Sequence, residues 1–255
     1  MNQYLLTPAA GKRLIAKALC EHPFIDDVLK SGTLAIIAGT TNGYVAQEIL
    51  KKIDQGHEFR PEKFFRGVVL PPKIPVKSSG RLYGDDKFPG DVIINQGEWL
   101  QGKTIFDVVD QLKTGDVILK GVNALDYIRR QAAIYIGDPK AGTIGAALQA
   151  VVGRRVKLIL PVGLEKRVYD DLYQISLKLN ETHQKGPRML PVPGEIFTEI
   201  EAIKQLTNCR AQLIASGGVA GAEGSIWLRL EGEDKELLSA SNLLKSVQNE
   251  ERFQI

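Results

Sequence analysis

Apolar residues form two patterns along the chain: continuous runs, and stripes that repeat every three or four positions. The run at 34–38 is continuous, as expected of a strand that is covered on both faces. Val45, Ile49 and Ile53 follow at helical spacing and predict an amphipathic helix. Comparable runs predict strands at 64–70, 91–95, 116–120, 133–136 and 156–160. Comparable stripes predict helices at 105–112, 125–131, 143–152 and 168–179.

Strands that alternate with helices predict an α/β protein with an open, mainly parallel sheet and helices on both of its faces. Thr7 and Pro8, a hydroxyl side chain followed by proline, predict the start of the first helix. The segment 70–90 is rich in proline, glycine and charge and interrupts the alternation. It is either a mobile loop or an extended excursion over an active site.

The segment 183–195 predicts a linker into a smaller unit. In that unit we expect strands at 189–192, 211–215 and 226–230 and helices at 196–206 and 236–247. This order is typical of a small α/β sandwich. We therefore predict a Rossmann-like ligand-binding domain at 1–185, with an insertion at about 70–90, and a small α/β domain at 186–255.

A short polar loop separates the run at 34–38 from the helix that follows. It consists of Gly39, Thr40, Thr41, Asn42 and Gly43. Free backbone N–H groups and the helix dipole make such a helix start attractive to an anion, and we expect a phosphate group there. The alternative is that Asn42 only caps the helix and the glycines only turn the chain. No Walker lysine follows, so a nucleotide-binding P-loop is not expected.

Three motifs lie at the C-terminal ends of predicted strands, where open parallel sheets bind ligands. They are IAGTTNG at 37–43, GVNALD at 121–126 and KAGT at 140–143. With them, the region 31–166 resembles the superfamily of ribose-5-phosphate isomerase, glucosamine-6-phosphate deaminase and CoA transferases. The residues of these motifs are most similar to those in the branch that contains methylthioribose-1-phosphate isomerase and the regulatory subunits of translation initiation factor 2B. The resemblance implies phosphate or substrate binding at the first loop, and a homo-oligomer.

The chain departs from this superfamily at the expected catalytic acids. Lys120 and Asn123 stand where the ribose isomerases carry aspartates, and Gln149 stands at the position of their glutamate. An amide cannot abstract a proton as a carboxylate does. Cys20 and Cys209 lie outside the region that matches the methylthioribose branch, so its catalytic cysteine has no counterpart. Two alternatives remain: an enzyme of another kind, or a non-catalytic ligand-sensing or regulatory protein.

Two carboxylates are candidate catalytic groups, Glu165 and Asp126. Glu165 follows a predicted strand and would supply a missing acid. Alternatively it only occupies the first turn of a helix, where the dipole favours it. Further strand-end residues are candidate ligand-binding groups, although each also has a solvated, capping or turn role as its alternative: Lys120, Gly121, Asn123, Asp138, Lys140, Gly142, Thr143, Gly163 and Lys166.

A glycine-rich connection at 216–225 joins two predicted strands and contains four glycines. Gly217 and Gly218 belong either to a backbone nest for an anion or to a lid over the main site. The alternative is a flexible hairpin.

Composition narrows the class of protein. A net charge of +3 without a basic run does not predict nucleic-acid binding. The two cysteines and three histidines show no metal-ligand spacing, and we expect neither a metal nor another cofactor. No apolar run approaches the roughly 20 residues that span a bilayer, so we expect a cytoplasmic protein that does not bind membranes.

These features predict a protein that binds a small phosphorylated metabolite. An isomerase-type enzyme is one version of this prediction. The alternatives are the non-catalytic ligand-sensing protein with the same site and a structural or interaction protein whose glycines serve only as turns.

Overall fold

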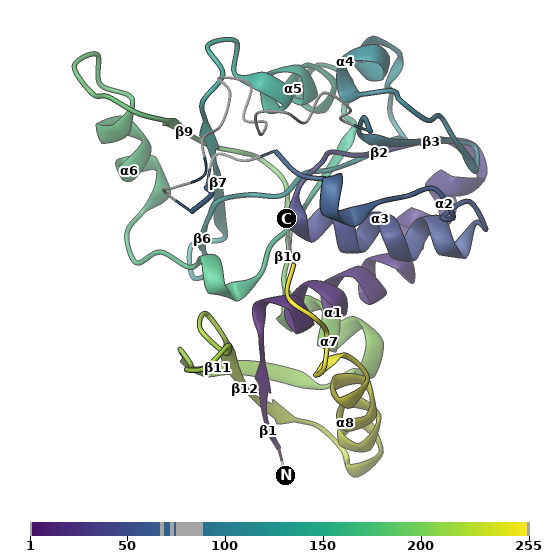
Figure 1. Cartoon of the computed structure of the whole chain (residues 1–255), viewed down its shortest axis with the longest axis vertical. Helices are drawn as coiled ribbons and strands as arrows, with labels where there is room; N and C mark the ends of the chain where they lie inside the picture. Colours follow the sequence, from purple (N-terminus) through teal and green to yellow (C-terminus); the bar gives the residue numbers. More distant parts are fainter. Residues whose placement is uncertain (1, 67–68, 72–73, 75–88, 254–255) are drawn as a thin grey trace.

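The computed structural model describes residues 2–66, 69–71, 74 and 89–253. These residues form a mixed α/β protein with a six-stranded, mainly parallel sheet, two three-stranded antiparallel sheets and eight α-helices (Figure 1). The prediction of an α/β fold with a mainly parallel sheet is therefore confirmed.

The central sheet has the strand order β10-β8-β5-β2-β3-β4. Its four parallel strands are β2 (Thr33–Ile36), β5 (Val117–Leu119), β8 (Lys157–Pro161) and β10 (Glu195–Phe197). Two antiparallel strands complete one edge, β3 (Val92–Asn95) and β4 (Glu98–Trp99). Because the four parallel strands point the same way, the segments that leave them all start at one side of the sheet, which we call the carboxyl edge.

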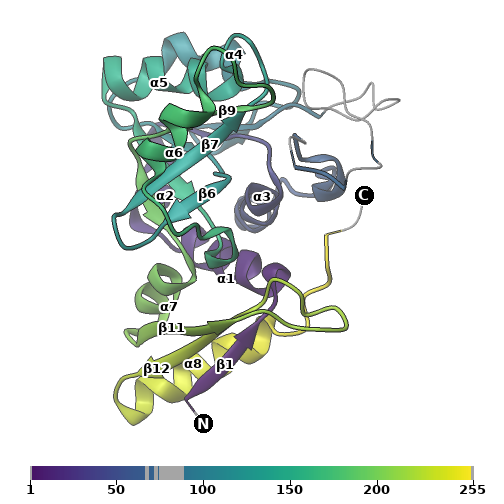
Figure 2. The ribbon, with the colours of Figure 1, turned by 90° about the vertical axis from the view of Figure 1, so that its left-hand side faces the viewer.

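Helices cover both faces of this sheet. On one side lie α4 (Ile105–Val108) and α5 (Gly142–Arg154), and on the other lie α1 (Pro8–Cys20), α2 (Pro23–Ser31) and α3 (Thr40–Lys52) (Figures 1 and 2). The apolar stripe of α3 packs as predicted, since Val45 and Ile49 are fully buried. The first helix also starts as predicted, because the Thr7 hydroxyl accepts a hydrogen bond from the backbone N–H of Ala10.

The second sheet joins the two ends of the chain. Its order is β1 (Gln3–Leu6), β12 (Ile226–Glu231) and β11 (Arg210–Ser216), all antiparallel. Burial alternates along β12, so only one face is covered, on the side of α7 (Glu199–Thr207) and α8 (Asp234–Val247). The N-terminal strand thus belongs to the C-terminal unit.

The expected division into 1–185 and 186–255 does not follow this strand pairing. β1 lies within the range predicted for the large domain but pairs with β12. Conversely, β10 pairs with β8 in the central sheet, and β9 (Arg188–Pro191) pairs with β7 (Gln131–Ile136). Local sequence patterns reveal such strands but not their partners, because pairing depends on residues distant in the chain.

The third sheet corrects two helix predictions. It consists of β6 (Ala124–Asp126), β7 and β9, and α6 (Leu172–Leu179) packs against it. The predicted helix at 125–131 is wrong: β6 ends at Asp126, whose carboxylate accepts the backbone N–H of Arg129 and closes a turn. The predicted helix at 168–179 begins only at Leu172, because Asp171 caps it.

Two further predictions, the strand at 64–70 and the insertion at 70–90, concern segments that the structure describes only in part. Phe64 follows a short 3₁₀ helix, η1 (Pro61–Lys63), and the strand predicted at 64–70 does not form in its described part. Most of the insertion at 70–90 lies outside the described residues.

Candidate ligand site at the carboxyl edge of the sheet

The loop after β2 forms the uncapped start of α3. The first N–H groups of an α-helix, here those of Thr40, Thr41 and Asn42, have no intrahelical carbonyl partner. Gly39 occupies the cap position and offers no side chain to bond them. The Thr41 hydroxyl is buried and finds no hydrogen-bond partner among the described residues. This 13-residue helix therefore presents unsatisfied donors and the positive end of its dipole at the carboxyl edge.

Asn42 has a different role from the predicted one. Its side-chain amide donates to the carbonyl oxygens of Ile37 at 2.7 Å and Leu119 at 3.0 Å. It thus joins the ends of β2 and β5 and neither caps the helix nor offers its two N–H donors to a ligand.

Asp91 fixes the same turn from the other side. This buried carboxylate accepts the backbone N–H groups of Ala38 and Ile105, each at 2.9 Å. Arg66 donates to it at 3.3 Å. Asp91 therefore holds the start of α3 in place and brings a guanidinium close to it.

Lys120 directly follows β5 at this edge. Burial lowers the pKa of its ammonium group to about 8; the carboxylate of Asp91 opposes this shift, and the cations of Arg66 and Lys166 add to it. Lys120 is thus a partly desolvated amine beside other cations. An anion bound there would stabilise the protonated, positively charged form of Lys120.

A second cluster lies at the ends of β8 and β10. Glu199, the first residue of α7, is buried and accepts the backbone N–H of Leu164 at 3.0 Å. Burial and the nearby Glu165 carboxylate raise the pKa of Glu199 to about 8. Lys166 donates to the Val122 carbonyl at 2.8 Å, and burial lowers the pKa of its ammonium group although Glu165 and Glu199 oppose that shift.

Two glycines make room for this acid pair. A Cβ atom on Gly11 of α1 would collide with a carboxylate oxygen of Glu199, and one on Gly163 would collide with that of Glu165. One oxygen of Glu165 is buried without a hydrogen-bond partner among the described residues. The pair therefore combines a carboxyl group whose pKa is raised by burial with a second carboxyl group close by, and Lys166 interacts electrostatically with both of them and with Lys120.

The second strand-end motif lies in the small sheet of β6 and β7. The Asn123 side-chain oxygen accepts the N–H of Tyr135 at 3.0 Å. Asp126 is buried, which raises its pKa, but hydrogen bonds and an ion pair at 2.8 Å with Arg129 outweigh this effect and lower it. Asp126 is therefore a structural anion locked to Arg129 and is not placed as a catalytic base.

The third motif begins α5 on the opposite face of the sheet from α3 (Figure 1). The Asp138 carboxylate accepts the N–H of Lys140 at 2.6 Å, and Ala141 and Gly142 both have positive φ. Thr143 is buried in the first turn of α5. Within the described part of the chain, Lys140 makes no hydrogen bond or ion pair with the clusters around Lys120 and Glu199.

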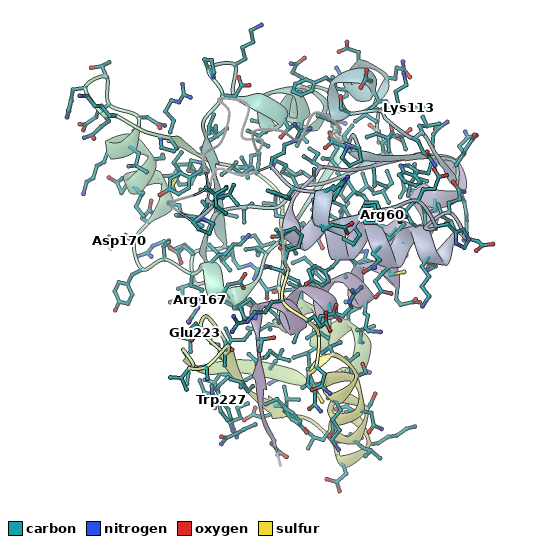
Figure 3. The ribbon with its side chains drawn as sticks, in the orientation of Figure 1. Arg60, Lys113, Arg167, Asp170, Glu223 and Trp227 are labelled. Atoms are coloured by element: carbon teal, nitrogen blue, oxygen red, sulfur yellow. The ribbon has the colours of Figure 1, made fainter. Side chains whose placement is uncertain are left out.

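The glycine-rich connection forms the β11–β12 hairpin, in which Gly217 and Gly218 have positive φ. Arg167, which follows Lys166 and is labelled in Figure 3, donates to the Ser216 hydroxyl at 3.2 Å and so bonds the hairpin base to the segment that contains Glu165 and Lys166. The base of the hairpin therefore lies beside the segment that carries Glu165 and Lys166.

Three residues of the site were missed from the sequence: Asp91, Arg66 and Glu199. Asp91 appeared only as the start of the strand predicted at 91–95, and Glu199 only as part of the helix predicted at 196–206. Their burial and proximity depend on the tertiary structure. In residues 2–66, 69–71, 74 and 89–253 no group of three or more His, Cys, Asp or Glu side chains is arranged to hold a metal ion.

Comparisons of the chain with models of protein families, with curated proteins and with solved structures give no match.

Proposed function

We propose that this protein binds a small phosphorylated metabolite at the carboxyl edge of the central sheet, between the start of α3 and Lys120. The observation that carries the proposal is the uncapped α3 terminus with the buried Thr41 hydroxyl, which has no hydrogen-bond partner in the part of the chain that the structure describes. A phosphate group accepts several hydrogen bonds and carries the negative charge that this helix end and the neighbouring cations favour. Arg66 and Lys166 add positive charge near Lys120.

A second candidate function is proton transfer on the bound metabolite. The acid pair favours it, because two carboxyl groups with different surroundings can hold one proton and exchange it with a substrate. Glu199, whose pKa is raised by burial, would act as the acid, and Glu165 would act as the base. The resemblance to sugar-phosphate isomerases is in keeping with this role. A ligand-sensing protein would share the phosphate site but show no turnover.

Calorimetric titration with inorganic phosphate, ribose 5-phosphate and glucosamine 6-phosphate tests the proposal. We expect binding that weakens about tenfold or more in Lys120→Met, because a hydrogen-bonded ion pair of this kind contributes roughly 1.5–3 kcal/mol. Lys113→Met is the matched control: this exposed lysine precedes the opposite end of β5 (Figure 3). Absence of binding by all three compounds would contradict the proposal and favour an interaction protein.

Proton transfer is tested separately in D₂O. If the acid pair is catalytic, the wild-type protein incorporates deuterium next to the carbonyl carbon of a sugar phosphate that it binds, and Glu199→Gln and Glu165→Gln lose this exchange while they retain phosphate affinity. Binding without exchange would indicate the ligand-sensing protein.

We also propose a cytoplasmic location and self-association. Cys20 and Cys209 are free and buried, which suits a reducing compartment. None of the helices in the described part of the chain has the length and apolar character to cross a membrane. Light scattering on the purified protein would measure its oligomeric state.

A further inference from the structure

The last described residues connect both units of the molecule. After α8 the segment 248–253, which we call the C-terminal strap, has no regular secondary structure. It leaves the small sheet and rises past α1 toward α3 (Figures 1 and 2).

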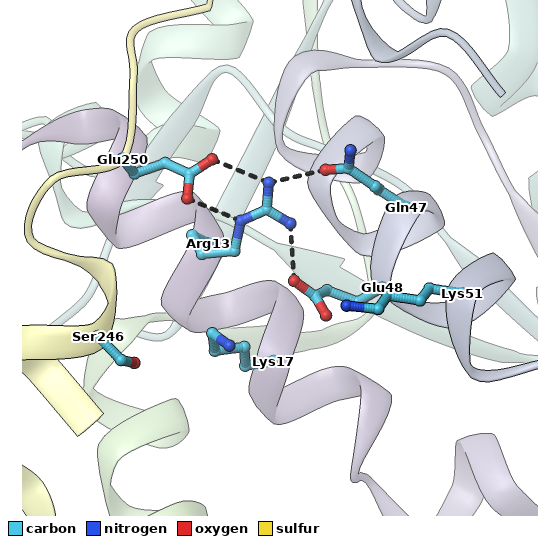
Figure 4. Close-up of a pocket in the computed structure, with 7 residues that line it drawn as sticks. All are labelled: Arg13, Lys17, Gln47, Glu48, Lys51, Ser246 and Glu250. Carbon is cyan, nitrogen blue, oxygen red and sulfur yellow. Dashed lines mark hydrogen bonds and ion pairs between the residues drawn. The ribbon is translucent and has the colours of Figure 1, made fainter. Parts of the chain in front are cut away.

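Arg13 of α1 holds the strap by a two-pronged ion pair. Its guanidinium donates to both carboxylate oxygens of Glu250, at 3.0 and 2.8 Å (Figure 4). The same group donates to Glu48 and Gln47 of α3, each at 2.7 Å. Both partners of the ion pair are largely shielded, with side-chain exposures of 13% for Arg13 and 23% for Glu250. Paired geometry of this kind is stronger and more directional than a single surface contact.

This junction borders a polar hollow of about 300 Å³, which Lys17, Lys51 and Ser246 also line. Arg13 additionally stacks over the Tyr44 ring, with its central carbon 4.8 Å from the ring centre. The strap therefore packs against both α1 and α3. It reaches the second turn of α3, the helix whose first turn forms part of the proposed phosphate site.

Three further contacts extend along the strap. The Tyr44 hydroxyl donates to the Glu251 carbonyl at 3.3 Å. Arg252 donates to the Gly221 carbonyl at 3.1 Å in the glycine-rich hairpin. Phe253 packs edge-on against Phe65, with ring centres 5.6 Å apart. The strap thus touches α3, the hairpin whose base is tethered beside Glu165, and the segment that carries Arg66.

The contact with Phe65 connects the strap to the site. Phe65 directly precedes Arg66, and Arg66 donates to Asp91, which holds the start of α3 through the Ala38 N–H. A displaced Phe65 would therefore shift the guanidinium that adds positive charge beside Lys120.

We propose that the C-terminal strap is a positioning element for the phosphate site, in which Glu250 and Phe253 keep Arg66 and the first turns of α3 in their binding arrangement. The inference rests on the proposed function and adds regulation to it: undocking of the strap weakens the site. Coupling between two sites is reciprocal, so a bound phosphate must also hold the strap down.

Two variants of the full chain test the forward direction. Glu250→Gln removes the charge that Arg13 binds, and Phe253→Ala removes the contact with Phe65. We expect each to weaken phosphate binding about fivefold or more in a calorimetric titration, as is typical of such coupling. Glu251→Gln is the matched control, because only the backbone carbonyl of Glu251 is bonded to Tyr44. Melting temperatures of all three variants show whether they remain folded at the titration temperature.

Hydrogen exchange tests the reverse direction. Inorganic phosphate should slow amide exchange of the peptide that covers 248–253 in the wild-type protein, and should have no such effect in Lys120→Met. Unchanged phosphate affinity in both strap variants, or strap exchange that does not respond to bound phosphate, would overturn the inference and leave the proposed function intact. Absence of phosphate binding by the wild-type protein would overturn both.

Discussion

Glu199 and Lys120 show how burial changes the chemistry of ordinary side chains. In solution both are charged at neutral pH. In the fold, desolvation moves the pKa of each to about 8, upward for the carboxyl group and downward for the amine. The two groups stand at the ends of different strands of the same sheet. Neither shift follows from residue type, because each depends on the neighbours that folding brings together.

The raised pKa of Glu199 has a consequence for stability. Between its ordinary pKa of 4.5 and about pH 8, the folded chain keeps a proton that the unfolded chain has lost. The free energy of unfolding should therefore fall as the pH rises through this window, by at most about 1.4 kcal/mol per pH unit from this group. Glu199→Gln should reduce that slope. Its free energy of unfolding, compared with that of the wild-type protein, should therefore be more favourable above pH 8 than at low pH.

Urea unfolding at several pH values measures this slope. Glu58→Gln provides the control, because Glu58 is exposed and should leave the slope as it is. A Glu199→Gln variant with the wild-type slope would show that the buried carboxyl group does not hold its proton at neutral pH.

At the scale of elements, the start of α3 is built by side-chain bonds to the backbone. Asp91 and Asn42 together hold the segment between β2 and α3, and Asn42 also reaches the end of β5. The uncapped helix end is therefore held in place by these bonds, although its first N–H groups have no hydrogen-bond partner among the described residues. An anion can bind to such a preformed loop without the entropy cost of ordering it first.

Asn42→Ala should destabilise the protein by about 1–3 kcal/mol, because it leaves the buried carbonyls of Ile37 and Leu119 without their amide donor. Asn242→Ala on the exposed face of α8 should change stability by less than about 0.5 kcal/mol. Chemical denaturation measures both. Equal stabilities of the two variants would mean that the amide bridge contributes nothing to the support of the site.

At the scale of the whole molecule, the two chain ends bind the units together. β1 supplies an edge strand to the C-terminal sheet, and the C-terminal strap returns to α1 and α3. Each unit therefore contains a segment from the far end of the sequence. We expect the two units to unfold in one cooperative transition, because neither keeps its full set of strands or contacts without the other.

Leu6 and Leu5 test the role of β1 within this arrangement. Leu6 is buried at 1% exposure, and Leu5 on the opposite face is 38% exposed. Leu6→Ala should lower the free energy of unfolding by about 2–5 kcal/mol, and Leu5→Ala should lower it much less. Denaturation followed by tryptophan fluorescence in a Trp99→Phe background would leave Trp227 as the only tryptophan and report on the small sheet, and circular dichroism would report on the whole chain. Similar losses for both variants would contradict the observed burial.

Much of the local structure was determined by the sequence itself. The apolar run at 34–38 predicted β2, and the stripe at Val45 and Ile49 predicted α3. A short continuous apolar run is typical of a buried strand, and a repeat of 3.6 residues is typical of an amphipathic helix. The glycine-rich start of α3 was also recognisable, since it lies between these two patterns. The helix wrongly expected at 125–131 shows the limit, because a single turn closed by Asp126 replaced it.

Only the tertiary structure decided which of these pieces meet. Strand pairing placed β1 beside β12 and β10 beside β8, because hydrogen bonds between strands do not depend on distance along the chain. Asp126 and Lys120 lie six residues apart, yet one became an anion locked to Arg129 and the other a partly desolvated amine. Glu199 became part of the candidate site because folding buried it beside Glu165, and burial is a property of the assembled molecule that no local pattern carries.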